Sequence, residues 1–151
     1  MSAYPSLTLP DLAGEARALA GFWAEGPVLI VHGHRTCGTT RLALPFVDRL
    51  HRRRTRGSVV AVLQDTPEAA RDLAREMGLE LPVLLEPDPY PLALALHLDA
   101  VPTLTLLDRG GKVRLSTTGF RRSDLEGFAQ ALGVEGALFT PQDKAPAQRP
   151  G

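Results

Sequence analysis

Short apolar runs alternate with amphipathic segments along this chain. Four runs rich in Val and Leu, each bounded by Gly, Pro or charged residues, occur at 28–31, 59–63, 82–85 and 103–107. Continuous apolar runs of this length suit strands that are buried on both faces of a sheet. The segments between them carry apolar residues at helical spacing. This alternation predicts an α/β fold with a mixed central sheet and helices on both faces.

Three of the predicted helices lie at 39–53, 91–98 and the segment after Ser123. Ser123 and Glu126 have the spacing of a capping box, which predicts that Ser123 is the N-cap of the last helix.

The predicted helix at 67–77 is marked at both ends. Thr66 precedes it as an N-cap, Pro67 suits the first helical position, and Gly78 ends it. Farther along the chain, residues 108–111 have the composition of a hairpin turn, so the last two strands are expected to be antiparallel.

The two ends of the chain differ in character. Leu7 and Leu9 predict an N-terminal strand, whereas residues 140–151 are polar and rich in proline. Such a segment cannot bury much apolar surface, which predicts a mobile tail. We therefore expect a single domain over 1–139 followed by a mobile tail at 140–151.

The composition of the chain indicates which kinds of charged partner are not expected. The 151 residues are 44% apolar and include 17 basic and 17 acidic residues, so the formal net charge is zero. No long-range field then attracts nucleic acid or an anionic membrane, and neither is expected as a partner. The first residues lack the basic start and apolar stretch of a secretory signal, which predicts a cytoplasmic protein.

Cys37 is the single cysteine of the chain. It cannot form an intramolecular disulfide, so it is a structural, reactive or intermolecular thiol. It lies between the apolar run at 28–31 and the helix predicted from Thr39. Unpaired backbone N–H groups at a helix N-terminus favour a thiolate over a thiol, which indicates a reactive cysteine.

The segment Cys37-Gly38-Thr39-Thr40, Pro45 five residues later, and Val101-Pro102-Thr103 before the last hairpin resemble the thioredoxin superfamily. The resemblance implies a cis peptide bond before Pro102, beside the redox cysteine. It also implies that Val101, Pro102 and Thr36 bind substrate, with the Val101 backbone free to pair with an extended peptide.

Within that superfamily, the sequence is most similar to redoxins of the TlpA and ResA type, which are related to AhpC/TSA proteins. The opening residues resemble their N-terminal hairpin, and the segment 66–85 resembles their inserted helix and strand. The similarity spans residues 4–132. It implies a thioredoxin-like three-layer sandwich.

Several positions depart from the family pattern. Thr40 stands where the second cysteine of Cys-x-x-Cys is usual, so the motif is a degenerate Cys-x-x-Thr and cannot close an internal disulfide. Gly33 and Thr36 replace aromatic residues, and Val31 replaces the buried acid of thioredoxin. His34 takes the place of the hydroxyl residue that precedes a peroxidatic cysteine.

Two residues near Cys37 have alternative interpretations. The Thr40 hydroxyl could hydrogen-bond the sulfur and stabilise a thiolate, or Thr40 could simply fill the site of a lost cysteine. His34 could tune the thiolate or shuttle a proton, or it could be a polar residue on an exposed loop.

Two other groups have residue types that bind ligands. His32, His34 and Cys37 have the side chains of a soft-metal site, but a fourth ligand is missing nearby, so no metal is expected. The basic run at 51–56 suits the C-terminal end of a helix better than it suits an anionic partner.

These observations predict a monothiol thiol-disulfide oxidoreductase without a cofactor. Cys37 forms a mixed disulfide with a low-molecular-weight thiol or a protein, with Thr40 as the second residue of the site. A second molecule must resolve the adduct, because the chain holds no other thiol. A non-catalytic binding or redox-sensing module and a peroxiredoxin-like peroxide reductase are the alternatives.

Overall fold

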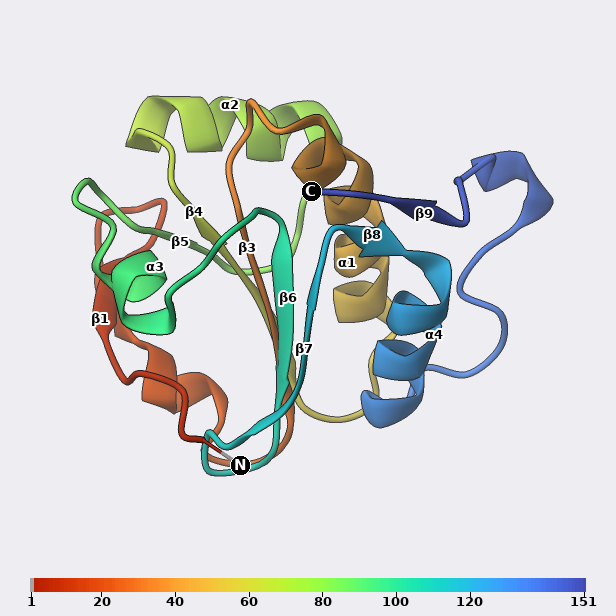
Figure 1. The fold of residues 1–151 in the computed structure, drawn as a ribbon, viewed down its shortest axis with the longest axis horizontal. Helices are drawn as coiled ribbons and strands as arrows, with labels where there is room; N and C mark the ends of the chain where they lie inside the picture. The colour runs from red at the N-terminus through yellow and green to blue at the C-terminus, as the bar shows by residue number, and fades with distance from the viewer. Residues whose placement is uncertain (1) are drawn as a thin grey trace.

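The structure is a computed structural model that describes residues 2–151 (Figure 1). A five-stranded mixed sheet lies at its centre, in the order β5-β4-β3-β6-β7. Three strands are parallel to one another, namely β3 (Val28–Gly33), β4 (Ser58–Leu63) and β5 (Val83–Leu85). The two remaining strands, β6 (Thr103–Leu107) and β7 (Val113–Thr118), form an antiparallel hairpin, and β6 runs antiparallel to β3.

Apolar side chains cover both faces of this sheet. One face packs against α1 (Gly38–Arg53), α2 (Pro67–Met77) and α4 (Arg122–Ala131). The other face packs against α3 (Pro91–Leu96) and the N-terminal segment, which contains β1 (Thr8–Pro10), β2 (Ala16–Ala18) and the 3-10 helix η1 (Leu19–Phe22). Figure 1 shows α1 and α4 on one side of the sheet and α3 and β1 on the other. The predicted three-layer α/β sandwich is confirmed.

The ends of most elements follow from local chemistry. The Thr66 hydroxyl accepts a hydrogen bond from Ala69 N at 3.2 Å, and Gly78 ends α2 with a φ of 64°. The antiparallel pair of β1 and β2 forms the expected N-terminal hairpin, although Leu7 lies just before it. Among residues 2–151 no helix is long and apolar enough to cross a membrane.

The start of α4 differs from the prediction. The helix begins at Arg122, with Arg121 at the N-cap position, so Ser123 lies within the first turn and the predicted capping box is wrong. Arg121 belongs to β8 (Phe120–Arg121), and the Arg122 N–H donates to Ala147 O at 3.0 Å. Pairing with a distant segment therefore fixes where the helix starts.

That distant segment belongs to residues 140–151, which are mostly exposed but form two short elements that contact the rest of the chain. The 3-10 helix η2 (Pro141–Asp143) is held by two hydrogen bonds from Arg49 to the Asp143 carboxylate, at 2.9 and 3.0 Å. Farther on, β9 (Gln148–Arg149) pairs antiparallel with β8. Composition predicts mobility because the segment is polar, and the structure connects it to the domain through an ion pair and backbone pairing, with little apolar burial.

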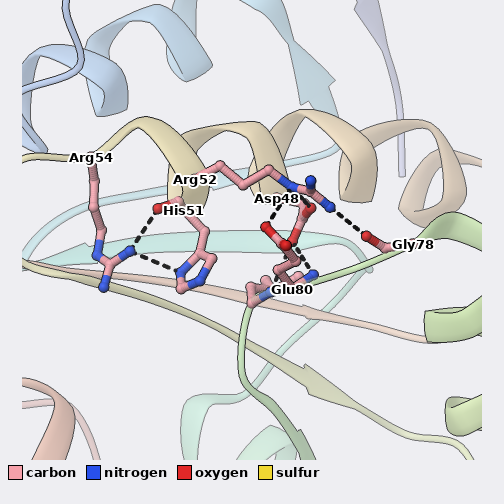
Figure 2. A network of polar contacts seen from close by, with 7 residues as sticks. Asp48, His51, Arg52, Arg54, Gly78 and Glu80 are labelled. Carbon is pink, nitrogen blue, oxygen red and sulfur yellow. Dashed lines mark hydrogen bonds and ion pairs between the residues drawn. The ribbon is translucent and has the colours of Figure 1, made fainter.

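The basic run at 51–56 begins in the last turn of α1, where Figure 2 shows a network of polar contacts. Asp48 accepts hydrogen bonds from Glu80 N and Leu81 N, both at 2.8 Å, and from Arg52 Nε at 2.6 Å. Arg52 also donates to the Gly78 carbonyl and lies 3.2 Å from the Glu80 carboxylate. These contacts fasten α1 to the connection between α2 and β5.

Other arginines of the run bind backbone carbonyls. Arg54 donates to His51 O at 2.6 Å, and Arg53 donates to carbonyls of the segment that follows α4. Arg56 donates to Gln130 O and Ala131 O, at 3.0 and 2.9 Å. These carbonyls lie at the C-terminal end of α4, where the helix dipole favours a positive charge. This arrangement favours the structural interpretation of the run over an anionic partner.

Candidate active site

Cys37 occupies the N-cap position of α1. Its backbone is extended, and its sulfur accepts a hydrogen bond from Thr40 N at 3.4 Å. The Cys37 N–H donates to His34 O at 3.2 Å, which closes the turn between β3 and α1. The side chain is partly buried. The sulfur therefore lies at the positive end of a helix and remains within reach of solvent.

Val101, which precedes Pro102, lies directly beside this cysteine. The peptide bond between Val101 and Pro102 is cis, and the Cys37 thiol donates to Val101 O at 3.4 Å. Antiparallel pairing of β3 with β6, which places His32 opposite Thr103, brings the two segments together. The structure thus joins the cysteine and the proline loop that the sequence resemblance connected.

The surroundings of Cys37 lower its pKa below the ordinary value. Partial burial raises the pKa, but hydrogen bonds from Thr40, through its hydroxyl and its backbone N–H, act in the opposite direction. The Thr39 N–H and the positive charge of Arg149 lower it further. These groups all stabilise the thiolate, which is the nucleophilic form of cysteine.

Thr40, whose backbone N–H donates to the sulfur, is fully buried. Within residues 2–151 its Oγ1 atom finds no hydrogen-bond partner while Cys37 is a thiol that donates to Val101. Loss of the thiol proton turns the sulfur into an acceptor, and the Thr40 hydroxyl can then donate to it. A methyl group at Gly33 would lie 2.7 Å from Thr40 Cγ2 and Oγ1, so the glycine makes room for this side chain.

His34 and Thr36 lie on the loop before Cys37. The Thr36 hydroxyl and His34 Nδ1 are hydrogen-bonded at 2.8 Å. Through its backbone carbonyl His34 holds the Cys37 N–H, whereas its imidazole is engaged with Thr36. The geometry therefore gives His34 a role in shaping the loop, and Thr36 is exposed.

His32 has different surroundings from His34. It is buried, and its Nε2 lies 2.6 Å from Glu86 Oε2. Because β3 ends at Gly33, the alternation that would place both histidines on one face stops between them. In the part of the chain that the structure describes, no three His, Cys, Asp or Glu side chains gather around a possible metal position.

Glu86 is a residue that the sequence analysis missed. Its carboxylate accepts hydrogen bonds from His32, from Gln64 Nε2 at 3.3 Å, and from Leu92 N and Ala93 N at the start of α3. Burial raises its pKa, but the His32 hydrogen bond and the other donors outweigh burial and lower it. Glu86 directly follows the apolar run that ends at Leu85, and no local pattern indicates that its carboxylate binds the first N–H groups of α3.

The sequence analysis also missed residues 148–151, whose first two residues pair with β8. Thr39 Oγ1 donates to Pro150 O at 2.6 Å, although the two residues are 111 positions apart. A methyl at Gly38 would lie 2.6 Å from Arg149 Nη2, so the guanidinium lies over the first turn of α1. No local pattern indicates such a contact.

Comparisons with known proteins agree with this geometry. No protein-family model matches the sequence, and the search of curated proteins returns no match. Among solved structures, the putative thiol:disulfide interchange protein DsbE from Chlorobium tepidum matches with a TM-score of 0.76 at 26% identity. The match covers 86% of this chain and 92% of that one.

Two further structures share the fold at lower identity. The thioredoxin domain of a thiol-disulfide oxidoreductase from Bacteroides vulgatus has a TM-score of 0.76 at 20% identity, over 85% of this chain and 94% of that one. A secreted disulfide oxidoreductase from Mycobacterium tuberculosis, homologous to Escherichia coli DsbE, has a TM-score of 0.71 at 14% identity, over 84% and 96%.

A cysteine at the N-cap of the first long helix, beside a Val-Pro loop at the start of an antiparallel strand, defines a thioredoxin-like domain. The chain has a thioredoxin-like fold and resembles solved thiol-disulfide oxidoreductases of the thioredoxin-like redoxin superfamily. Within it, the fold is that of thiol-disulfide oxidoreductases of the DsbE, ResA and TlpA type.

Proposed function

We propose that this protein is a monothiol thiol-disulfide oxidoreductase. The Cys37 thiolate attacks one sulfur of a disulfide, a bond forms between Cys37 and that sulfur, and the other sulfur leaves as a thiolate. The product is a mixed disulfide on Cys37. An external thiolate then attacks this adduct, takes the bound group as a new disulfide and restores the Cys37 thiolate.

The observation that carries this proposal is the N-cap position of Cys37, with Thr40 as the facing residue. The helix N-terminus and the Thr40 hydroxyl lower the pKa of the thiol, which supports nucleophilic attack near neutral pH. A hydroxyl at position 40 cannot resolve the adduct, because its pKa is too high for attack on sulfur. The chain has one cysteine, so resolution falls to a second molecule.

The substrate is either a low-molecular-weight disulfide or a protein disulfide. Val101 lies beside the sulfur and Thr36 immediately precedes Cys37 on an exposed loop, so their backbone groups and the Thr36 hydroxyl are the candidates to bind an extended substrate segment. The mechanism needs a pool of free thiol, which the cytosol supplies, and a cytoplasmic location is part of this proposal.

Intact-protein mass spectrometry tests the proposal. We expect reduced protein mixed with glutathione disulfide to gain one glutathione on Cys37 and to keep it until free thiol is added. The Cys37→Ser variant, which lacks the thiol, serves as the control and should gain nothing. If the reduced wild-type protein stays unmodified at neutral pH, the proposal is wrong.

A redox-sensing module without turnover is a second candidate. It is favoured by the occupied surface around Val101, where residues 148–151 of the same chain lie. Turnover separates the two functions. An oxidoreductase transfers electrons from excess free thiol to insulin disulfides repeatedly, whereas a sensor accepts one group per molecule and does not accelerate insulin reduction.

A further inference from the structure

Residues 148–151 lie against the loops that form the candidate active site. Figure 1 shows the C-terminal end of the chain beside the upper end of α1. Just before this end, β9 pairs with β8. Pro150 O accepts the hydrogen bond from the buried Thr39 hydroxyl in the first turn of α1. The segment therefore contacts the same helical turn that holds the Cys37 sulfur.

The backbone of this segment also approaches the Val101 loop. A methyl group at Gly151 would overlap the Val101 carbonyl, which is the oxygen that accepts from the Cys37 thiol. A methyl at Gly119 would lie 2.7 Å from Arg149 O and 3.0 Å from Gly151 N. Two glycines thus allow close backbone contact along the edge beside Pro102.

We propose that residues 148–151 are an intramolecular ligand of the substrate groove, and that they must leave before an extended peptide or protein disulfide reaches Cys37. This inference rests on the proposed function. The segment is extended and runs beside the Val101 loop, which is how a peptide adds itself to a sheet edge. The partner that displaces it is accordingly an extended peptide segment.

The contacts that hold the segment are few enough to break. Within residues 2–151 it has a two-residue strand pair and one side-chain hydrogen bond, and its residues are exposed. The Arg49–Asp143 ion pair anchors the chain upstream, so the last residues can move away while η2 stays in place. Release is then a local event that leaves the core intact.

The experiment compares a peptide disulfide with a small one. The first probe is a short extended peptide whose cysteine carries a 2-thiopyridyl group, and the second is 2,2′-dithiodipyridine. In both reactions Cys37 attacks a disulfide sulfur and 2-thiopyridone leaves, which is followed by its absorbance. Rates are measured well above the pKa of Cys37, so that loss of the Arg149 charge does not change the fraction of thiolate.

We expect deletion of residues 148–151 to accelerate the peptide reaction about tenfold and the small-disulfide reaction less than about twofold. A groove that is free in about one molecule in ten reduces the apparent rate by that factor. Adding a synthetic peptide of residues 145–151 to the truncated protein should slow the peptide reaction again.

A single substitution keeps the test independent of truncation. Thr39→Val removes the hydrogen bond to Pro150 with little change of shape and should also accelerate the peptide reaction. Thr55→Val is the matched control, because Thr55 Oγ1 donates to Gly133 O at 2.8 Å near the other end of α1.

The two failures are distinguishable. If the peptide reacts equally fast with the full chain, the truncated chain and Thr39→Val, residues 148–151 do not block the groove. The proposed function is not affected by that result. A Cys37 that reacts with neither probe in any variant overturns both.

Discussion

At the scale of single residues, the reactivity of Cys37 depends on which groups face its sulfur in each protonation state. The thiol donates to Val101 O, while Thr40 N donates to the sulfur and the Thr40 hydroxyl has no partner among residues 2–151. After deprotonation the sulfur accepts from both Thr40 groups. A buried hydroxyl without a partner is costly, so its satisfaction in the thiolate form contributes to the lowered pKa of Cys37.

Replacing Thr40 tests this account. Thr40→Val removes the hydroxyl and should raise the pKa of Cys37, since hydrogen bonds to charged groups contribute about 1.5 kcal/mol. The inflection in the pH dependence of alkylation by iodoacetamide should move to higher pH. Thr40→Ser keeps the hydroxyl and is the control. An unchanged inflection in the pH dependence of the Val variant would contradict the role of the hydroxyl.

A second substitution at the same position tests the monothiol route. Thr40→Cys places a thiol one helical turn from Cys37 and should allow an internal disulfide, because the spacing then matches Cys-x-x-Cys. We expect faster reduction of insulin with dithiothreitol as reductant than the wild-type protein achieves. Equal rates would mean that the absence of a second thiol does not limit this protein.

The sequence predicted part of this site from local spacing. Cys37 at a helix start and Thr40 one turn later could be predicted, because both lie on one element. The hydrogen bond between His34 and Thr36 depends on the shape of an irregular loop, and the space that Gly33 leaves for Thr40 depends on packing between elements. Neither follows from the order of residues.

At the scale of elements, Glu86 connects three parts of the fold. It follows β5, hydrogen-bonds His32 on β3, and accepts from the first backbone N–H groups of α3. A carboxylate at a helix N-terminus satisfies donors that have no partner within the helix. Glu86 therefore fixes the position of α3 against the sheet.

Glu86→Gln should destabilise the protein at neutral pH by about 1 to 3 kcal/mol, because charge-assisted hydrogen bonds in a buried site are lost. The fold lowers the pKa of Glu86 below its ordinary value of 4.5, so the carboxylate stabilises the protein above that pH. This contribution is lost as the pH falls through the lowered pKa.

Urea unfolding from pH 7 down to pH 3 measures the effect. The difference in stability between wild type and Glu86→Gln should be largest at neutral pH and should shrink at the acidic end. Glu25→Gln, at an exposed acid, is the control. A difference that stays constant with pH would show that ionisation of Glu86 does not stabilise the fold.

Element boundaries were predictable where local groups set them. Thr66, Pro67 and Gly78 determine the ends of α2 through their own backbone and side chains, and α2 runs over 67–77 as expected. Ser123 had equally good local chemistry, but Arg121 pairs with Gln148 in β9 and shifts the helix start. A contact across that many residues leaves no local pattern.

At the scale of the whole molecule, the last twelve residues return from α4 to the candidate active site. Their anchor is the bidentate pair of Arg49 and Asp143, and the Arg49 side chain also donates to Leu138 O at 2.8 Å. Hydrogen bonding to Arg49 holds the pKa of the Asp143 carboxyl far below its ordinary range. Asp143 thus stays ionised at neutral pH and keeps the returning segment in place.

Asp143→Asn should loosen this return without unfolding the domain. We expect the backbone amides of residues 144–151 to exchange hydrogen severalfold faster, while amides of β3 and β4 keep the wild-type rate. Asp72→Asn is the matched control, since Asp72 pairs with Arg75 on the exposed face of α2. Equal exchange of residues 144–151 in both variants would contradict the anchoring role.

The hydrogen bond between the Cys37 thiol and Val101 O has a consequence for how oxidation is transmitted. A sulfur that carries an adduct has no proton to donate, so modification disconnects α1 from the loop before β6. The mobility of the loop around Val101, 64 positions away in the sequence, then depends on whether the Cys37 sulfur is modified. At a pH below the pKa of Cys37, where the free cysteine is a thiol, amide exchange of residues 98–101 should report whether the cysteine is free or modified, even when the rest of the fold is unchanged.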